Sequence, residues 1–306
     1  MLNKNHKKII FCVHGASSFI GKNFCKLLIS KKYRLVILSR GASDLNFLKN
    51  KRGVKIYRYR HSISELIGKV KVPSNSVFVN LAWAGVFGTE KNKSTQITIN
   101  IPQIISSVEF AKDIRVRHWI GFGSQAEYAK INQRIDEKFP CEPETLYGKA
   151  KLISSTISME LCQAYGIEYS WLRLFSTYGS DGNHNWLIDY LIDEMSNNRK
   201  INVTKCEQYL DYLYVDDISN LLIYLGDSKG VGVVNLGSGK ATQLKKVIEI
   251  IRSLTKSKSI INYGAVPNKS DQGMFNEADI SKVLKLTGWK PKVSIKQGLS
   301  KIIKPD

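Results

Sequence analysis

The chain has 306 residues, enough for one large hydrophobic core or two smaller ones, and its 43% hydrophobic and 24% charged contents are typical of a globular protein. It contains no apolar run of about 18 residues and only five scattered cysteines without a CxxC pair, so we expect a cytoplasmic protein with no membrane span, disulfide framework or metal. The formal charge of +20 is spread along the whole chain, which favours solvated lysines over a nucleic-acid partner.

In the first half of the chain, short β-rich runs alternate with amphipathic stretches, which is the pattern of a parallel α/β sheet. Strands are predicted at residues 8–13, 34–38, 54–59, 76–81, 118–122 and 169–175. Helices are predicted at residues 22–30, 95–112 and 147–165.

After residue 175 the alternation loosens, with helices predicted at 186–197, from 216, at 244–255 and at 280–286, and a short strand at 233–236. We therefore predict a Rossmann-type doubly wound parallel sheet with a smaller, mixed C-terminal substrate-binding region. The dinucleotide-binding domain is expected to span residues 1–175, with the chain returning to it around 201–236. The substrate-binding region is then expected at residues 176–200 and 237–306.

A glycine-containing turn separates the first predicted strand from the first helix. Gly15 and Gly21 have the spacing of the outer glycines of a GxxGxxG motif, with Ser18 in the middle position. Glycine lets the backbone approach a pyrophosphate while the helix N-terminus faces its charge. An ordinary strand-to-helix turn has the same spacing, but the place in the first βαβ unit favours dinucleotide binding. The predicted contacts from this turn are Gly15, Ser17, Ser18, Phe19, Ile20 and Gly21.

The end of the second predicted strand indicates which dinucleotide is bound. An acidic residue there would bond the ribose 2′-hydroxyl and repel a 2′-phosphate. This chain has Ser39 and Arg40 instead, and the nearby Asp44 lies beyond them. Because a guanidinium suits a phosphate, NADP is predicted in preference to NAD.

A YxxxK pair is formed by Tyr147 and Lys151, and Tyr147 is the only tyrosine with a lysine four residues on. Upstream, the run Gly-Ser-Gln-Ala-Glu-Tyr at 123–128 resembles the Ser/Thr-x-x-x-Tyr-Gly segment of short-chain dehydrogenases/reductases, with Ser124 in the catalytic hydroxyl position. Further stretches are similar to motifs of the extended, nucleotide-sugar-modifying branch of that superfamily. They are Asn-Leu-Ala at 80–82, RLFSTYG at 173–179, QYLDYLYVDD at 208–217, NLGSG at 235–239 and the closing segments at 278–279 and 288–291.

The resemblance implies roles for individual residues. Tyr147 would transfer a proton, Lys151 would tune it and contact the cofactor ribose, and Ser124 would hydrogen-bond the substrate oxygen. Asn100 stands where the family carries an asparagine near the cofactor and is the fourth predicted catalytic residue. A tyrosine with an ordinary pKa near 10 needs a neighbouring cation to act near neutral pH. The turn after the fourth strand would add cofactor contacts from Leu81 and Ala82.

Residues that this chain lacks after Ser124 narrow the possible reaction types. Sugar 4,6-dehydratases carry Asp-Glu after the hydroxyl residue, and here those places hold Gln125 and Ala126. Epimerase/reductases resembling GDP-fucose synthase need a cysteine near the Ala126 position and a histidine such as His184, yet a histidine in a polar loop is more often solvated. A 4-epimerase recycles tightly held NAD, whereas a net reductase commonly draws on NADPH.

Arg40 and the segment 264–279, which resembles the tail of reductases of the CDP-abequose-synthase type, favour reduction of a nucleotide-diphosphate-linked 4-keto-6-deoxysugar. A nucleotide-sugar 4-epimerase is the alternative. Relatives often place an arginine on the diphosphate where Leu210 stands, so we predict that Lys269 contacts it here. The predicted substrate-binding residues are Gln125, Ser176, His184, Asn185, Lys205, Tyr212 and Lys269.

The predicted partners are a nucleotide-sugar substrate and a second copy of the chain. The resemblance implies a homodimer formed through the helices at 95–112 and 147–165. A non-catalytic dinucleotide sensor or an RNA-binding relative is a further alternative. The intact set of Ser124, Tyr147 and Lys151 argues against it.

Overall fold

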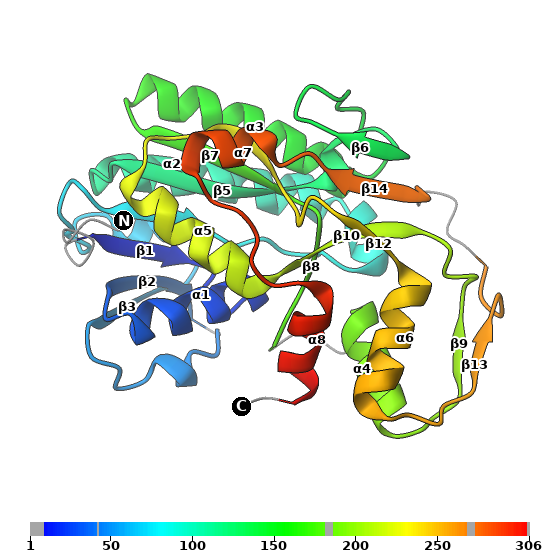
Figure 1. Cartoon of the computed structure of the whole chain (residues 1–306). Helices are drawn as coiled ribbons and strands as arrows, with labels where there is room; N and C mark the ends of the chain where they lie inside the picture. Colours follow the sequence, from blue (N-terminus) through cyan, green and yellow to red (C-terminus); the bar gives the residue numbers. More distant parts are fainter. Residues whose placement is uncertain (1–8, 42, 181–185, 268–272, 305–306) are drawn as a thin grey trace.

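The computed structural model describes residues 9–41, 43–180, 186–267 and 273–304. Within these ranges, a seven-stranded parallel sheet has the order β3-β2-β1-β4-β5-β7-β11 (Figure 1). The direction of winding reverses between β1 and β4, which is the doubly wound arrangement, so the predicted fold class is confirmed. The strands are β1 (Ile10–His14), β2 (Arg34–Arg40), β3 (Val54–Tyr59), β4 (Val77–Asn80), β5 (His118–Ser124), β7 (Glu168–Leu174) and β11 (Gly232–Leu236).

Helices cover both faces of this sheet. Apolar residues of α1 (Phe19–Ser30) and α5 (Val215–Asp227) share one core cluster with the sheet, and α2 (Ile101–Asp113) and α3 (Leu146–Ala164) pack on the other face. The central strands are buried on both faces and therefore consist of nearly continuous apolar residues. Such runs are what made these strands predictable.

A smaller region lies beside the main sheet, along the right-hand side of Figure 1 from β6 and β14 at the top to α4 and α6 at the bottom. Its second sheet has the order β12-β10-β14-β6, with β8 paired to β10, and a separate pair joins β9 and β13. The strands are β6 (Gln133–Ile135), β8 (Ser176–Tyr178), β9 (Ile201–Val203), β10 (Tyr209–Tyr214), β12 (Ala241–Gln243), β13 (Ile261–Tyr263) and β14 (Phe275–Ala278). Its helices are α4 (Leu187–Ser196), α6 (Leu244–Thr255) and α8 (Ile295–Ile303), which pack around β10, and α7 (Ser281–Thr287) packs on β11.

The structure differs from the predicted elements in two ways. The helix expected at 95–112 begins with a wider π-helical turn at Gln96–Asn100, and α2 follows it. Helix α8 and the short strands of the second sheet were not predicted. Among the described residues, no helix is long and apolar enough to cross a membrane.

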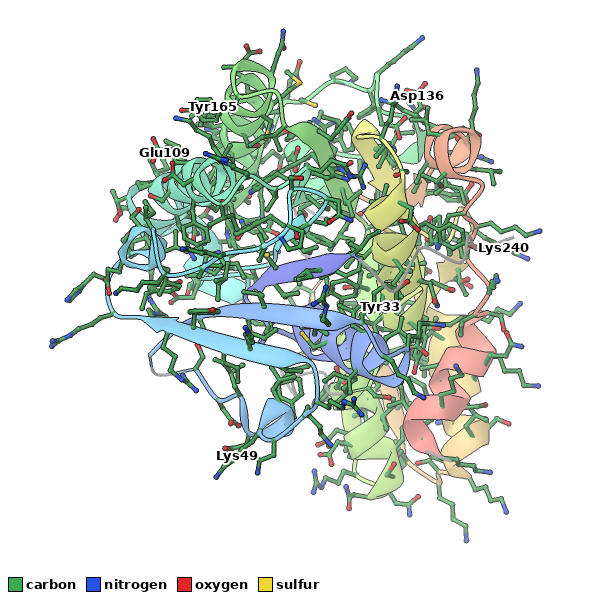
Figure 2. The ribbon with its side chains drawn as sticks, turned by 90° about the vertical axis from the view of Figure 1, so that its left-hand side faces the viewer. Tyr33, Lys49, Glu109, Asp136, Tyr165 and Lys240 are labelled. Atoms are coloured by element: carbon green, nitrogen blue, oxygen red, sulfur yellow. The ribbon has the colours of Figure 1, made fainter. Side chains whose placement is uncertain are left out.

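The excess positive charge is distributed over the surface. Figure 2 shows nitrogen-tipped side chains projecting around the outline of the molecule, with Lys49 and Lys240 far apart. The charge is therefore not gathered into a single patch in this view.

Candidate active site

A cavity of about 480 Å³ opens where β1, β2 and β4 end. This is the edge at which doubly wound sheets bind their ligands, outside the carboxyl ends of the strands at the point of reversal. Of the residues predicted to bind cofactor, those that line this cavity are Gly15, Ser17, Ser18, Ser39, Arg40, Leu81 and Ala82.

The glycine turn fits a dinucleotide pyrophosphate. Gly15 has a φ of +90°, and a Cβ on it would lie 2.6 Å from the backbone nitrogen of Ala82, so a side chain there would be strained and would collide with the facing strand turn. Ser18 caps α1 by accepting a hydrogen bond from the Gly21 N–H at 3.1 Å, and the cavity therefore meets a helix N-terminus. Phe19 stacks edge-on against Trp186, and Ile20 packs on the core; neither lines the cavity.

Sequence reasoning missed His14, which contributes to the wall of the same cavity. Its ring nitrogens lie 2.8 Å from the Asn80 side-chain oxygen and 2.7 Å from the Tyr59 hydroxyl. Burial lowers the pKa of His14 to about 4, against a smaller opposing effect of the Asn80 bond, so the imidazole is neutral near pH 7. His14 was hard to recognise as a cavity residue from the sequence, because its two hydrogen-bond partners come from different strands.

The end of the cavity formed by β2 and β3 is basic. Arg40 and His61 line it, together with Ser39 and Ser43, and none of the described residues that line the cavity is acidic. Asp44 instead caps a turn by accepting a hydrogen bond from the Asn46 N–H at 3.0 Å. This end therefore suits an anionic group on the ligand.

Tyr147, Lys151 and Ser124 come together outside the linings of this cavity and of a second one, and Trp83, which lines the first, lies over Lys151. Tyr147 and Lys151 lie one helical turn apart in the first turns of α3, and Ser124 ends β5. Lys151 is buried, donates to the Phe122 carbonyl at 2.6 Å and has its Nζ 3.6 Å from the centre of the Trp83 ring. The structure thus places three of the four predicted catalytic side chains in one cluster.

Burial dominates the protonation of this cluster. It raises the pKa of Tyr147 to about 12, while a hydrogen bond with the Ser124 side chain acts in the opposite direction. Burial lowers the pKa of Lys151, and the charge of Glu127 opposes that effect. A catalytic tyrosine in this state needs positive charge nearby to become a better acid.

Asn100 is buried and holds the loop after β4. Its amide accepts from the Ala84 N–H at 2.9 Å and donates to the Ala84 carbonyl at 3.0 Å. The neighbouring Gln96 accepts from Trp83 Nε1 at 2.9 Å and donates to the Glu90 carbonyl at 3.0 Å. Asn100 does not line either cavity, so its contact with the catalytic cluster runs through this loop and Trp83.

The second cavity measures about 560 Å³ and lies between the catalytic cluster and the C-terminal region. Gln125 and Ser176, two of the residues predicted to bind substrate, line this cavity. Sequence reasoning missed Gln208, which also lines it and opens the QYLDYLYVDD stretch. The amide oxygens of Gln125 and Gln208 are buried without a hydrogen-bond partner among the described residues, which makes them acceptors for a ligand.

The remaining predicted substrate residues are placed differently. Tyr212 is buried in the C-terminal core against Tyr178 and does not line the cavity, and Lys205 is exposed and absent from its lining, although the adjacent Thr204 and Cys206 line it. His184, Asn185 and Lys269 lie outside the described residues.

The two cavities can bind a dinucleotide and a second ligand, and a hydroxyl pair and a buried cation lie next to residues of both linings. Such a cluster can move a proton to or from an oxygen held between the two cavities. In the described part of the chain, no three His, Cys, Asp or Glu side chains are grouped to hold a metal ion.

Known proteins match the chain over almost its whole length. A CDP-abequose synthase from Salmonella muenchen is 27% identical over 99% of both chains, and a UDP-glucuronate 4-epimerase from Thermodesulfobacterium geofontis is 26% identical over 96% of this chain and 94% of the other. The structure of a UDP-glucuronic acid 4-epimerase from Bacillus cereus, in complex with UDP-glucuronic acid and NAD, has a TM-score of 0.81 at 19% identity, covers 96% of this chain and 98% of that one, and shows the same fold.

The family model described as the NAD dependent epimerase/dehydratase family matches residues 11–237, which include the glycine turn, Ser124, Tyr147 and Lys151. This chain belongs to the NAD dependent epimerase/dehydratase family.

Proposed function

We propose that this protein reduces a nucleotide-diphosphate-linked 4-keto-6-deoxysugar to its 4-hydroxy product, with NADPH as the preferred cofactor. The cluster of Tyr147, Ser124 and Lys151, whose neighbours Trp83 and Gln125 line the two cavities, supports keto–hydroxyl chemistry, and the basic, acid-free end of the cofactor cavity around Arg40 carries the choice of net reduction. The bound nicotinamide would supply the hydride.

The protein residues then provide and direct a proton. Ser124 Oγ accepts the Ala126 N–H at 3.2 Å, which leaves its own hydrogen for the substrate keto oxygen or Tyr147. The Tyr147 hydroxyl gives its proton to that oxygen as negative charge develops on it. The ammonium of Lys151, buried beside it, favours the resulting phenolate.

A nucleotide sugar fits the second cavity and the named relatives. The relative from Salmonella muenchen is named as a synthase of a CDP-linked sugar, and the Bacillus cereus neighbour holds UDP-glucuronic acid. Gln125 and Gln208 offer acceptors toward hydroxyl or amino groups of such a ligand. We propose that Lys269 contacts the diphosphate, since it is a cation close in sequence to the cavity residues Val266 and Pro267.

The second candidate is a 4-epimerase with tightly bound NAD. The identity of 26% to a UDP-glucuronate 4-epimerase and the NAD in the Bacillus cereus neighbour favour it, and the same three catalytic residues serve both reactions. The two functions differ in whether the cofactor is consumed.

An absorbance assay tests the proposal. Purified protein is mixed with NADPH and a panel of nucleotide-linked 4-keto-6-deoxysugars, and the reduced cofactor is followed. We expect oxidation that depends on one nucleotide sugar. Absence of oxidation with every member, together with NAD that co-purifies with the protein, would replace the reductase by the epimerase.

Replacement of Arg40 by alanine is expected to weaken the binding of NADPH selectively. Loss of one charge-assisted contact to the 2′-phosphate should raise the KM for NADPH about tenfold and leave that for NADH within about twofold. Arg34→Ala is the matched control, because Arg34 is exposed at the opposite end of β2. Equal changes for the two cofactors in Arg40→Ala would contradict an interaction with the 2′-phosphate.

We also propose a homodimer formed through α2 and α3. These helices pack side by side, and Ile97, Ile153 and Met159 are exposed on or next to them, at 41%, 41% and 38%. Ile153→Glu should therefore convert a dimer to a monomer in sedimentation, because burying a carboxylate at such a face is costly. Ile260→Glu, at a residue that is 66% exposed and lies next to β13, should leave the dimer intact. A wild-type monomer would refute the proposal.

A further inference from the structure

Glu127 is a carboxylate that lies behind the catalytic cluster. Its side chain is 0% exposed and lines neither cavity. It stands two positions after Gln125, beyond the places that hold the acids of a dehydratase. The carboxylate therefore has no access to substrate, and it can act only through the residues that it contacts.

Three groups hold this carboxylate. Oε1 accepts hydrogen bonds from the Ser124 N–H at 2.9 Å and from Trp171 Nε1 at 3.0 Å. Oε2 accepts from Arg173 Nε at 2.8 Å, and the Arg173 guanidinium is itself buried and lies 4.6 Å from the centre of the Tyr128 ring. A buried charge with this many partners is a built feature of the structure.

The main sheet leaves room for this carboxylate. Gly123 of β5 lies opposite Arg173 of β7, and a Cβ on Gly123 would collide with both Glu127 Oε1 and Trp171 Nε1. Glycine is thus required because the carboxylate approaches the backbone directly before Ser124.

The same carboxylate shares a neighbour, Trp171, with the catalytic cation. Lys151 is buried under Trp83 and, apart from the Phe122 carbonyl, is surrounded by aromatic rings, including Trp171 at 5.8 Å. An ammonium in such a place is costly unless an anion is nearby. The negative charge of Glu127 raises the pKa of Lys151, against the larger effect of burial.

We propose that Glu127 is a positioning residue that fixes the backbone of Ser124 and whose negative charge keeps the Lys151 ammonium protonated during the reaction. This inference rests on the proposed reduction. Arg173 and Trp171 hold the carboxylate in place, and Gly123 provides its space.

The expected pH dependence has a definite sign. Burial raises the pKa of Tyr147 and lowers that of Lys151, and the charge of Glu127 raises both. Without that charge both pKa values fall. Reduction requires both Tyr147 and Lys151 to be protonated. Without the Glu127 charge, the loss of activity that occurs as the pH rises should therefore begin at a lower pH. Further titratable or charged groups lie near the Glu127 carboxylate, near Arg173 or near Tyr147. They are Tyr128, Glu137, Cys141, Tyr169 and Lys91.

The pH profile of kcat/KM tests the proposal in three variants. Glu127→Gln keeps the shape of the side chain and should move the alkaline limb down by about one pH unit, with kcat about tenfold lower. Glu127→Gln combined with Arg173→Gln avoids an unpaired guanidinium and should move the limb in the same direction, since Glu127 holds the Ser124 N–H and shares Trp171 with Lys151.

Asp211→Asn is the matched control. Asp211 is also a buried carboxylate that accepts backbone N–H groups, from Ser238, Gly239 and Ala278, but it lies in the second sheet. Its replacement should lower stability and leave the alkaline limb in place. A limb that is unshifted in a folded Glu127→Gln or in the double variant would overturn the proposal and leave Glu127 a merely structural role.

A second readout is independent of the sugar. The phenolate absorbance of Tyr147 is titrated as the difference between each variant and the same variant carrying Tyr147→Phe, with NADP⁺ bound. The pKa of Tyr147 should be lower in both Glu127 variants than in the wild type. An equal pKa would overturn the proposal even if no sugar of the panel were reduced, so its failure is distinct from failure of the proposed function.

Discussion

Tyr147→Phe is expected to lower kcat by about a thousandfold while the protein still binds NADPH with a Kd within about threefold of the wild type. The variant loses the hydroxyl that delivers the proton, but it keeps the aromatic ring that packs edge-on against Trp83. Steady-state kinetics and a fluorescence titration with NADPH measure the two effects separately.

Tyr165→Phe is the control for this result. Tyr165 follows the last turn of the same helix, α3, far along the chain from Ser124 and Lys151, and Figure 2 shows it at the upper edge of the molecule. We expect its kcat to be unchanged. If Tyr147→Phe kept more than about a tenth of the wild-type kcat, Tyr147 would not be the proton donor.

Lys151→Met is expected to abolish most activity and at the same time to stabilise the protein without cofactor. Methionine is similar in length and needs no counter-charge, whereas the ammonium of Lys151 is buried beneath Trp83. The kcat should fall by about a hundredfold or more, because Tyr147 loses the cation that favours its phenolate. Thermal unfolding near neutral pH should show a higher Tm for the variant.

The sign of this stability effect depends on pH. The folded-state pKa of Lys151 is lowered by burial, so between that pKa and its ordinary value near 10.4 the unfolded chain binds more protons than the folded one. Wild-type stability relative to Lys151→Met should therefore rise as the pH rises through this window. A difference in Tm that stays constant with pH would show that the ammonium is not destabilising in the folded state.

The main sheet could be predicted because its strands are buried on both faces. The strands from Ile10 to His14 and from Val77 to Asn80 are fully buried, and each reads as an unbroken or nearly unbroken apolar run. The turn at Gly15 and the YxxxK pair could be found because their function requires fixed spacings along one segment. Local spacing of this kind is enough to identify Ser124, Tyr147 and Lys151 as candidates from the sequence.

The second sheet could not be predicted because its strands are short and its pairings join distant segments. Asn276 pairs with Gln133, and Tyr212 pairs with Ser176, in strands of three to six residues. Tyr212 belongs to the QYLDYLYVDD stretch and was predicted to bind substrate, yet its side chain is buried in the C-terminal core. Periodicity over so few residues does not indicate which face is buried.

The polar groups behind the site were missed for a related reason. His14 is held by residues of β3 and β4, and Glu127 by Trp171 and Arg173 of β7, so no local spacing connects either one with these partners; only the bond from the Ser124 N–H to Glu127 is local. Glu127 and Arg173 each occur in a recognisable stretch of sequence, but only the pairing of β5 with β7 shows that they form an ion pair.

The number of NADPH molecules oxidised for each sugar converted is the most direct test of net reduction. With the transferable hydrogen of NADPH replaced by deuterium, mass spectrometry of the sugar also reports where that hydrogen goes. We expect one cofactor oxidised per product and one deuterium retained at C4. Sugar conversion without net oxidation of the cofactor, and without deuterium in the product, would contradict the reductase and establish an epimerase that recycles its NAD.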